Sequence, residues 1–254
     1  MDSECICYPL VTIHYPLMSL RIDILTLFPE MFDGFLSTSI PKRAANKGLV
    51  SYHLHNPRAV ATDAHQSVDD KPFGGGPGMV MMAPIIVGAV EKAEAEDDRL
   101  ATRILLTPQG RRFDQSIARE LSQRPRLLLI NGRYEGLDER IIETLDPLEL
   151  SLGDFVLSGG ELASMVVVDA VVRLLPGALG AEGGADDESF ADGLLEYPQY
   201  TRPREFRGRT VPEMLLSGDH KKIAAWRQEQ RVARTKVRRP DLYEAYERRT
   251  RREV

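Results

Sequence analysis

Cysteine is almost absent from this chain of 254 residues, because both cysteines, Cys5 and Cys7, lie within its first seven positions. They are too close together for an ordinary disulfide, and no further cysteine completes a zinc site. The rest of the chain has none, which excludes a disulfide framework, a thiol nucleophile and a thiolate metal site there. Such a distribution is typical of a cytoplasmic enzyme.

Long apolar runs are also lacking, since none approaches the roughly 18 to 20 residues that a membrane helix needs. We therefore expect no membrane partner. The first nineteen residues begin with acidic side chains, lack a basic segment and are interrupted by Pro9, His14 and Pro16, so they do not fit a secretory signal. Because Met18 stands just before the first clear strand, we expect residues 1–19 to be a disordered tail or the product of a start codon assigned too early.

The common nucleotide-binding fingerprints are missing too. The sequence contains no GxxxxGK[ST] and no GxGxxG between a strand and a helix. P-loop enzymes are therefore excluded, and a nicotinamide-dependent oxidoreductase is disfavoured.

The sequence does contain apolar strand-like runs that alternate with amphipathic helical segments. The expected strands are Arg21–Phe28, Leu49–His55, Arg103–Leu106, Arg126–Ile130 and Glu149–Leu157. The expected helices are Glu30–Leu36, Pro41–Lys47, Ala83–Glu96, Phe113–Leu121, Asp138–Leu145 and Glu161–Leu175. This alternation predicts an α/β fold with a mostly parallel sheet.

Three expected strands are followed by glycine and polar residues, in TPQGR, NGRYEG and SLGDFVLSGGE. Ligands of open α/β sheets bind outside the carboxyl ends of the strands, where glycine lets them approach the backbone. Leu152 and Leu157 would supply an apolar slot, and backbone groups could read the edge of an adenine. A separate polar loop, Asn56–Pro77, ends in a glycine cluster that either faces a phosphate or another chain, or is simply mobile.

The end of the chain differs in charge from the rest. Residues 201–254 carry 16 Lys and Arg against 8 Asp and Glu, whereas the preceding residues carry 17 against 30. This basic end predicts a polyanionic partner, or else a solvated helical face. We expect a domain at 20–179, a Gly-rich acidic linker at 180–200 and a basic helical domain at 201–254, with a long helix at His220–Arg238 and a last helix from Pro240.

Eight blocks occur in a recognisable order: GGGPGM, TPQGR, GRYEGLDER, SLGDFVLSGGE, TRP, LLSGDH, AWR and RRPDL. Together they resemble the bacterial tRNA (guanine-N1)-methyltransferase family, which methylates the guanine immediately 3′ of the anticodon. The resemblance covers Leu20 to about Tyr243. It implies a SPOUT fold with a deep trefoil knot, S-adenosylmethionine as methyl donor, tRNA as substrate and a homodimer with shared active sites.

The resemblance also implies which residues form the cofactor pocket. They are Thr107, Pro108, Gly132, Tyr134, Glu135, Ser151, Leu152, Gly153, Phe155, Leu157, Gly159 and Gly160. The family usually has tyrosine where Phe155 stands and often proline where Ala163 stands, and both changes keep an apolar wall. A magnesium requirement is attributed to the family, with an indirect role for Glu135, but no spacing here indicates a tight metal site.

For catalysis, the resemblance implies an arginine that stabilises O6 of the guanine and a carboxylate that removes the N1 proton. Arg173 matches the arginine, although a lone cation in an apolar helix is also compatible with a snorkelling or ion-paired side chain. The family has aspartate two residues before a linker phenylalanine, and here that position is Glu188, with Asp187 before it. Ungapped alignment favours Glu188, while a shift of one residue would assign the role to Asp187, and both could instead be solvated linker acids.

The residues expected to contact RNA lie in two regions, the loop before the glycine cluster and the basic end. They are His65, Asp69, Asp70, Arg202, Arg204, Arg227, Arg231, Arg234, Arg238 and Arg239. Trp226 is more typical of a core position than of a base-stacking one. Two further alternatives stay open: a related knotted methyltransferase with another RNA target, and a non-catalytic RNA-binding protein that has kept the pocket.

Overall fold

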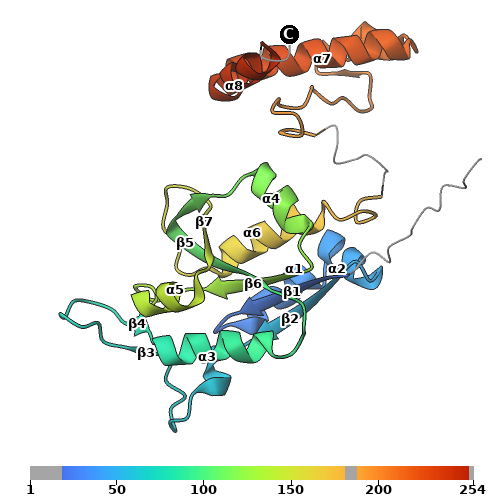
Figure 1. The fold of residues 1–254 in the computed structure, drawn as a ribbon. Coiled ribbons are helices and arrows are strands. Elements are labelled where there is room, and N and C mark those ends of the chain that lie inside the picture. Colours follow the sequence, from blue (N-terminus) through green and yellow to red (C-terminus); the bar gives the residue numbers. More distant parts are fainter. Residues whose placement is uncertain (1–18, 181–187, 252–254) are drawn as a thin grey trace, which may run out of the picture. The chain divides into compact units, whose positions relative to one another are not determined.

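The computed structural model describes residues 19–180 and 188–251, and the chain divides into two compact units (Figure 1). The first unit ends at Ala178 and the second begins at Leu179. Cys5, Cys7 and Asp187 lie outside the described residues. Among the described helices, none is both long and apolar enough to cross a membrane.

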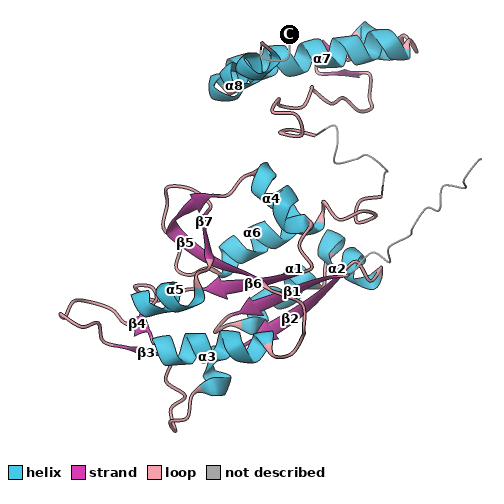
Figure 2. Ribbon diagram, in the orientation of Figure 1, coloured by secondary structure: helices cyan, strands magenta, loops and turns pink. Residues whose placement is uncertain are grey.

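The first unit is built on a five-stranded sheet in the order β2-β1-β6-β5-β7 (Figure 2). Its strands are β1 (Leu20–Leu25), β2 (Val50–His55), β5 (Thr102–Arg112), β6 (Arg126–Asn131) and β7 (Leu148–Ser151). Every neighbouring pair is parallel, which confirms the predicted α/β fold with a parallel sheet. All residues of β1 and β6 are buried, as expected for central strands that helices cover on both faces.

Helices cover both faces of the sheet (Figure 1), and alternate residues of the central strand β6 belong to two different cores. Leu127 and Leu129 belong to the core on one face of the sheet, whereas Leu128 and Ile130 belong to the core on the other. The first face is covered by α2 (Ser39–Asn46), α4 (Gln115–Ser122) and α6 (Glu161–Val172). The second is covered by α3 (Ala83–Glu94) and α5 (Glu139–Leu145). Short turns η1 (Pro29–Phe32), α1 (Asp33–Leu36) and η2 (Pro57–Val60) complete this unit together with a small hairpin, β3 (Asp69–Asp70) and β4 (Val80–Met81).

Two strands end far from the predicted residue, and β1 also ends early, at Leu25 instead of Phe28. The strand expected to end at Leu106 continues through TPQGR to Arg112, with a register shift against β7 between Leu106 and Arg111. Gly110 permits this continuation, because a Cβ there would lie 2.5 Å from the backbone of Glu149. Conversely, the strand expected to reach Leu157 ends at Ser151, whose Oγ lies 3.2 Å from the Gly153 nitrogen and starts a turn. Apolar residues 155–157 therefore belong to a loop.

The second unit is mainly helical, as predicted. The long helix α7 spans His220–Arg238 and is followed by α8 (Pro240–Thr250). Before them stand a small hairpin, β8 (Glu205–Phe206) and β9 (Arg209–Thr210), and the turn η3 (Glu213–Leu216).

Part of the segment expected to be a linker packs onto α7. Leu194 is fully buried, and the Leu195 amide donates to Thr235 Oγ1 at 2.9 Å. Asp192 accepts from Arg231 Nη2 at 2.5 Å. These residues are therefore a structured part of the second unit.

Candidate functional site

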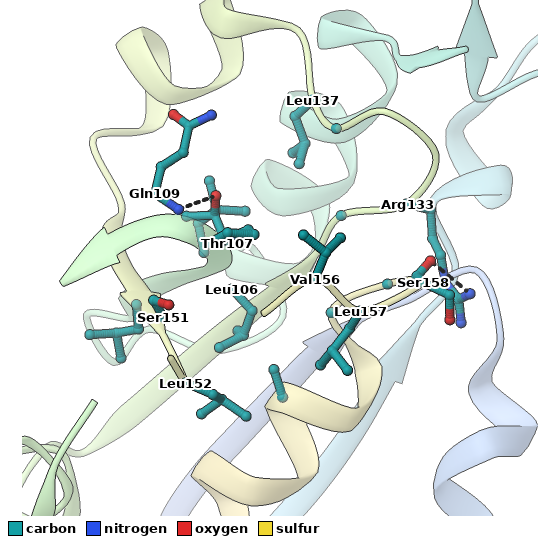
Figure 3. Close-up of a pocket in the computed structure, with 18 of the residues that line it drawn as sticks. Leu106, Thr107, Gln109, Arg133, Leu137, Ser151, Leu152, Val156, Leu157 and Ser158 are labelled. Atoms are coloured by element: carbon teal, nitrogen blue, oxygen red, sulfur yellow. Dashed lines mark hydrogen bonds between the residues drawn. The ribbon is translucent and has the colours of Figure 1, made fainter. Parts of the chain in front are cut away.

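A cavity of about 300 Å³ lies at the carboxyl ends of β6 and β7 and beside the bulge of β5 (Figure 3). Figure 3 shows Leu106, Leu152, Val156 and Leu157 around its middle, with Thr107 and Gln109 on one side and Arg133 and Ser158 on the other. Every residue that the sequence assigns to the cofactor pocket lines this cavity, from Thr107 to Gly160. The structure therefore brings together the bulged part of β5 and the loops after β6 and β7, which are far apart in the chain.

Part of the cavity wall is backbone packed closely against backbone. The Gly160 amide donates to the Gly132 carbonyl at 3.0 Å, and a Cβ at Gly160 would lie 2.9 Å from Cα of Asn131. A side chain at Gly160 would thus push the start of α6 away from the end of β6. Glycine at this position keeps the two cavity loops in contact.

A buried ion pair fixes the same junction. Glu161, the first residue of α6, is 1% exposed, and its Oε2 lies 2.9 Å from Arg133 Nε. Its other oxygen accepts from Thr26 Oγ1 at 3.0 Å, so the carboxylate links the residue after β1, the start of α6 and the loop after β6. Asn131 adds a second link, donating to the Leu25 carbonyl at 3.0 Å while accepting from Ser164 Oγ at 2.5 Å.

The sequence reasoning missed Glu161, Arg133 and Asn131. A signal was present, because all three stand inside or beside the blocks NGRYEG and SGGE, and a carboxylate at the start of an apolar helix needs a partner when buried. Gln109, Leu137 and Val156 also line the cavity and were not predicted. They belong to the same blocks as the predicted residues.

The loop after β6 contacts the hairpin of β3 and β4, whose connecting loop contains the glycine cluster. The Glu135 amide donates to the Met79 carbonyl at 3.0 Å, and the Glu135 side chain packs so closely on Gly78 that a Cβ there would lie 2.3 Å from Oε1. Partial burial, together with a hydrogen bond to Asp69, raises the pKa of the Tyr134 phenol above its ordinary value. The predicted RNA-contacting Asp69 therefore lies beside a cavity residue, whereas His65 and Asp70 are exposed.

The predicted catalytic arginine is not in this cavity. Arg173 directly follows α6, whereas the cavity lies at the start of that helix, about 20 Å away at 1.5 Å of rise per residue. Arg173 instead lines a separate groove with Phe35, Gln115, Met165, Val166, Asp169 and Ala170. Glu188 is half-buried in the second unit. One chain's first unit thus contains the cavity without the predicted catalytic arginine beside it.

The arginines predicted to contact RNA differ in their surroundings. Arg202, Arg204, Arg238 and Arg239 are exposed, with Arg204 paired to Glu213 and Arg239 to Asp241, each at 2.6 Å. Arg231 is only 8% exposed. Its guanidinium donates to Asp192, so its charge is paired within the second unit. Arg227 stacks over the Tyr197 ring, 4.5 Å from its centre. Arg234 and Trp226 are half-buried.

Among the described residues, one group of side chains has an arrangement that could hold a metal ion: Asp23, His55 and Glu96. Asp23 already accepts from Arg126 Nε at 2.7 Å and from Arg21 Nη2 at 2.8 Å. Burial acts to raise the pKa of Asp23, but hydrogen bonds from His55, Arg21 and Arg126 hold it far below its ordinary value. Two guanidinium groups oppose a further cation there, so this group is best explained as a buried ion-pair network.

Comparison with known proteins gives a consistent result. The family described as tRNA (Guanine-1)-methyltransferase TrmD has a sequence model that matches residues 20–245. Proteins named tRNA (guanine-N(1)-)-methyltransferase are similar over most of their length. The relative from Rhodopirellula baltica is 55% identical over 88% of this chain and 93% of its own length, and that from Moorella thermoacetica is 55% identical over 88% and 90%. The Chloroflexus aurantiacus protein is 56% identical over 88% of each chain.

Proposed function

This chain belongs to the tRNA (guanine-1)-methyltransferase family, and from that premise we propose that it methylates N1 of the guanine immediately 3′ of the anticodon. It is a methyltransferase that acts on tRNA and uses S-adenosylmethionine. The observation that supports methyl transfer is the cavity at the ends of β6 and β7, where all the residues expected to bind the cofactor meet.

The cavity suits S-adenosylmethionine in shape and chemistry. Leu106, Leu152 and Leu157 offer apolar surface to an adenine, while exposed backbone groups of the glycine-bearing loops can pair with its edge. At Gly160 the cavity wall is packed so closely that a Cβ would collide with Asn131. Bound S-adenosylmethionine supplies a methyl group on a positively charged sulfonium, so the protein's main task is to align donor and acceptor.

The N1 proton of guanine is weakly acidic and must be removed for methylation. We assign this step to the Glu188 carboxylate, with Asp187 as the alternative. A positioned general base contributes typically about 10²- to 10⁴-fold to the rate. As the proton leaves, negative charge moves to O6, where the guanidinium of Arg173 would stabilise it through directed hydrogen bonds.

Arg173 can serve this role if it acts at the cavity of a second copy of the chain. The groove that it lines contains Phe35 and Val166, and the same face of α6 leaves Leu162 51% and Val166 49% exposed. Apolar side chains on consecutive turns of a helix are typical of a surface that another chain covers. This supports a homodimer in which each copy completes the site of the other.

The tRNA would be held mainly through its phosphates by the exposed arginines of the second unit, with Asp69 close to the target guanine. We place this reaction in the cytoplasm. Any Mg²⁺ at this site would be held loosely, because Glu135 and Glu139 line the cavity but do not by themselves form the oxygen cage of a tight magnesium site.

The proposal is tested by transfer of a tritiated methyl group to tRNA transcripts with G or A immediately 3′ of the anticodon. Only the G transcript should be labelled, and nucleoside analysis should find 1-methylguanosine. Labelling of both transcripts, or of another nucleoside, would favour a related RNA methyltransferase. No labelling, together with retained tRNA binding, would favour a non-catalytic RNA-binding protein.

A further inference from the structure

The second unit contains a cavity of its own, of about 520 Å³, between residues 197–204 and the start of α7. It is formed by the segment before β8, the turn η3 and the first two turns of α7, and it shares no residue with the cofactor cavity. Its lining includes Tyr200, Arg202, Arg204, Val211, Ile223 and Arg227.

The lining separates into an apolar wall and a basic rim. Val211, Leu215 and Ile223 form apolar surface, and Tyr200 adds an aromatic ring that is 48% exposed. Arg202 and Arg204 are exposed at the same cavity. A ligand that fits this division has a flat, largely apolar part and an anionic part, as a nucleotide does.

Arg227 provides the most specific observation. Its guanidinium stacks over the ring of Tyr197, which is 8% exposed, and this stacking fixes the plane of the group. Its Nε is buried and has no hydrogen-bond partner among the described residues, a state that the Nε atoms of Arg133 and Arg231 share. Because Arg227 also lines the cavity, its guanidinium can donate there to a base carbonyl, a ring nitrogen or a phosphate oxygen.

We propose that this cavity binds one nucleotide of the tRNA other than the methylated guanine. Its base would lie against Tyr200 and the apolar wall, Arg227 would donate to an acceptor of the nucleotide, and the neighbouring phosphates would lie at Arg202 and Arg204. The proposal rests on the proposed function, because the nucleotide belongs to the tRNA substrate. It requires a second nucleotide, because the target guanine must reach the cofactor cavity of the first unit.

The test compares Arg227→Met with Lys221→Met in the full chain. Both changes remove one positive charge from α7, but Lys221 is exposed and does not line the cavity. We expect Arg227→Met to weaken binding of a tRNA transcript about tenfold, and Lys221→Met less than about threefold. Because a directed contact is screened less than a surface charge, the difference should persist at raised salt. Equal losses would overturn the proposal.

A second pair isolates the aromatic ring. Tyr200→Leu should weaken tRNA binding about five- to tenfold, at the lower end of what stacking of one base contributes, whereas Tyr200→Phe should retain it. Equal affinity of both variants would contradict a stacked base. Thermal unfolding and S-adenosylhomocysteine binding of each variant show whether the fold is kept.

The third measurement needs no variant and so remains decisive if a substitution unfolds the unit. Ultraviolet irradiation of the wild-type protein with tRNA, followed by mass spectrometry, should give a nucleotide adduct within residues 197–227. Adducts confined to the rest of the chain would overturn the proposal. A Leu216→Trp variant gives a further check. If it changes the oligomeric state but leaves tRNA affinity intact, the proposal is overturned, because the cavity would then hold part of a second copy.

Failure of this inference can be distinguished from failure of the proposed function. If the wild-type protein methylates the G transcript but Arg227→Met binds tRNA as Lys221→Met does, only the nucleotide cavity is wrong. If the wild-type protein neither binds nor methylates the transcript, the proposed function itself is wrong.

Discussion

The two ends of α6 are built differently. At its start, Glu161 is 1% exposed and Gly160 packs on the backbone of β6, so this part of the cavity wall is closely packed within one chain. At its end, Arg173 lies in a groove beside the half-exposed Val166. From this difference we infer a division of labour: one chain would hold the methyl donor by itself, whereas the groups that act on the guanine would come together only in an assembly. The following predictions test this division.

The largest effect is expected for the general base. Glu188→Gln keeps the size of the side chain but cannot take a proton, so kcat should fall by about 10²- to 10⁴-fold. Asp187→Asn is the matched control and should have a mild effect. Rates should be measured in single turnover, with tRNA affinity measured separately and expected to be unchanged. A severe loss in Asp187→Asn with a mild one in Glu188→Gln would transfer the role, and mild effects in both would remove it from both.

The next largest effect concerns the other end of α6. Arg173→Met removes the guanidinium but keeps the aliphatic stem, and kcat should fall by about 10²- to 10³-fold, as when a group that stabilises an oxyanion is lost. Affinity for S-adenosylmethionine should not change, because Arg173 does not line the cofactor cavity. Calorimetric titration checks this point. A parallel loss of cofactor affinity would contradict the division between the two ends.

At the start of α6 we expect a substitution to lower the free energy of unfolding as well as activity. Glu161→Gln leaves the Arg133 charge without its buried partner, which costs about 3 kcal/mol or more of the free energy of unfolding. Glu120→Gln is the control, since it breaks the exposed pair with Arg124 and should cost less than about 1 kcal/mol. Denaturant unfolding measures both. Equal costs would mean that the ion pair does not hold the junction.

The smallest effect is expected for a single methyl group in the cavity wall. Gly160→Ala places a Cβ 2.9 Å from Asn131 Cα and should weaken S-adenosylmethionine binding roughly tenfold by displacing the start of α6. Gly88→Ala adds the same methyl group within α3, where nothing lies within 4 Å, and should leave affinity unchanged and stabilise the helix slightly. Normal S-adenosylmethionine affinity in Gly160→Ala would show that the start of α6 can shift without disturbing the cavity.

The sequence predicted best those helices and strands whose limits depend only on their own residues. The apolar run at β6 and the cap-to-proline span of α7 were predicted closely, because periodicity and end signals are local properties. The extension of β5 was missed because it depends on Gly110 meeting the backbone of β7, a contact between distant segments. The end of β7 was missed for the opposite reason, since residues 155–157 are apolar but line a cavity instead of a sheet.

In the candidate site, too, the features that depend on contacts between distant segments were not predicted. The cavity residues could be assigned from ordered sequence blocks, and the structure brings them together. Neither the blocks nor the spacing of charges indicated that Arg231 would be buried against Asp192, because that pair joins positions 39 residues apart. Likewise, the trefoil knot and the contribution of a second copy are properties of chain path and assembly, and they stay predictions.

The most direct test of the division between the two ends of α6 is complementation between two inactive variants. Gly160→Val should lose the cofactor and Arg173→Met should lose the guanidinium, so each homodimer should be inactive. Co-expression with two different tags allows the mixed dimer to be purified and assayed for methyl transfer to tRNA. We predict that activity returns, because the intact cavity of the Arg173→Met copy receives the arginine of the Gly160→Val copy. A mixed dimer as inactive as its parents would contradict the account.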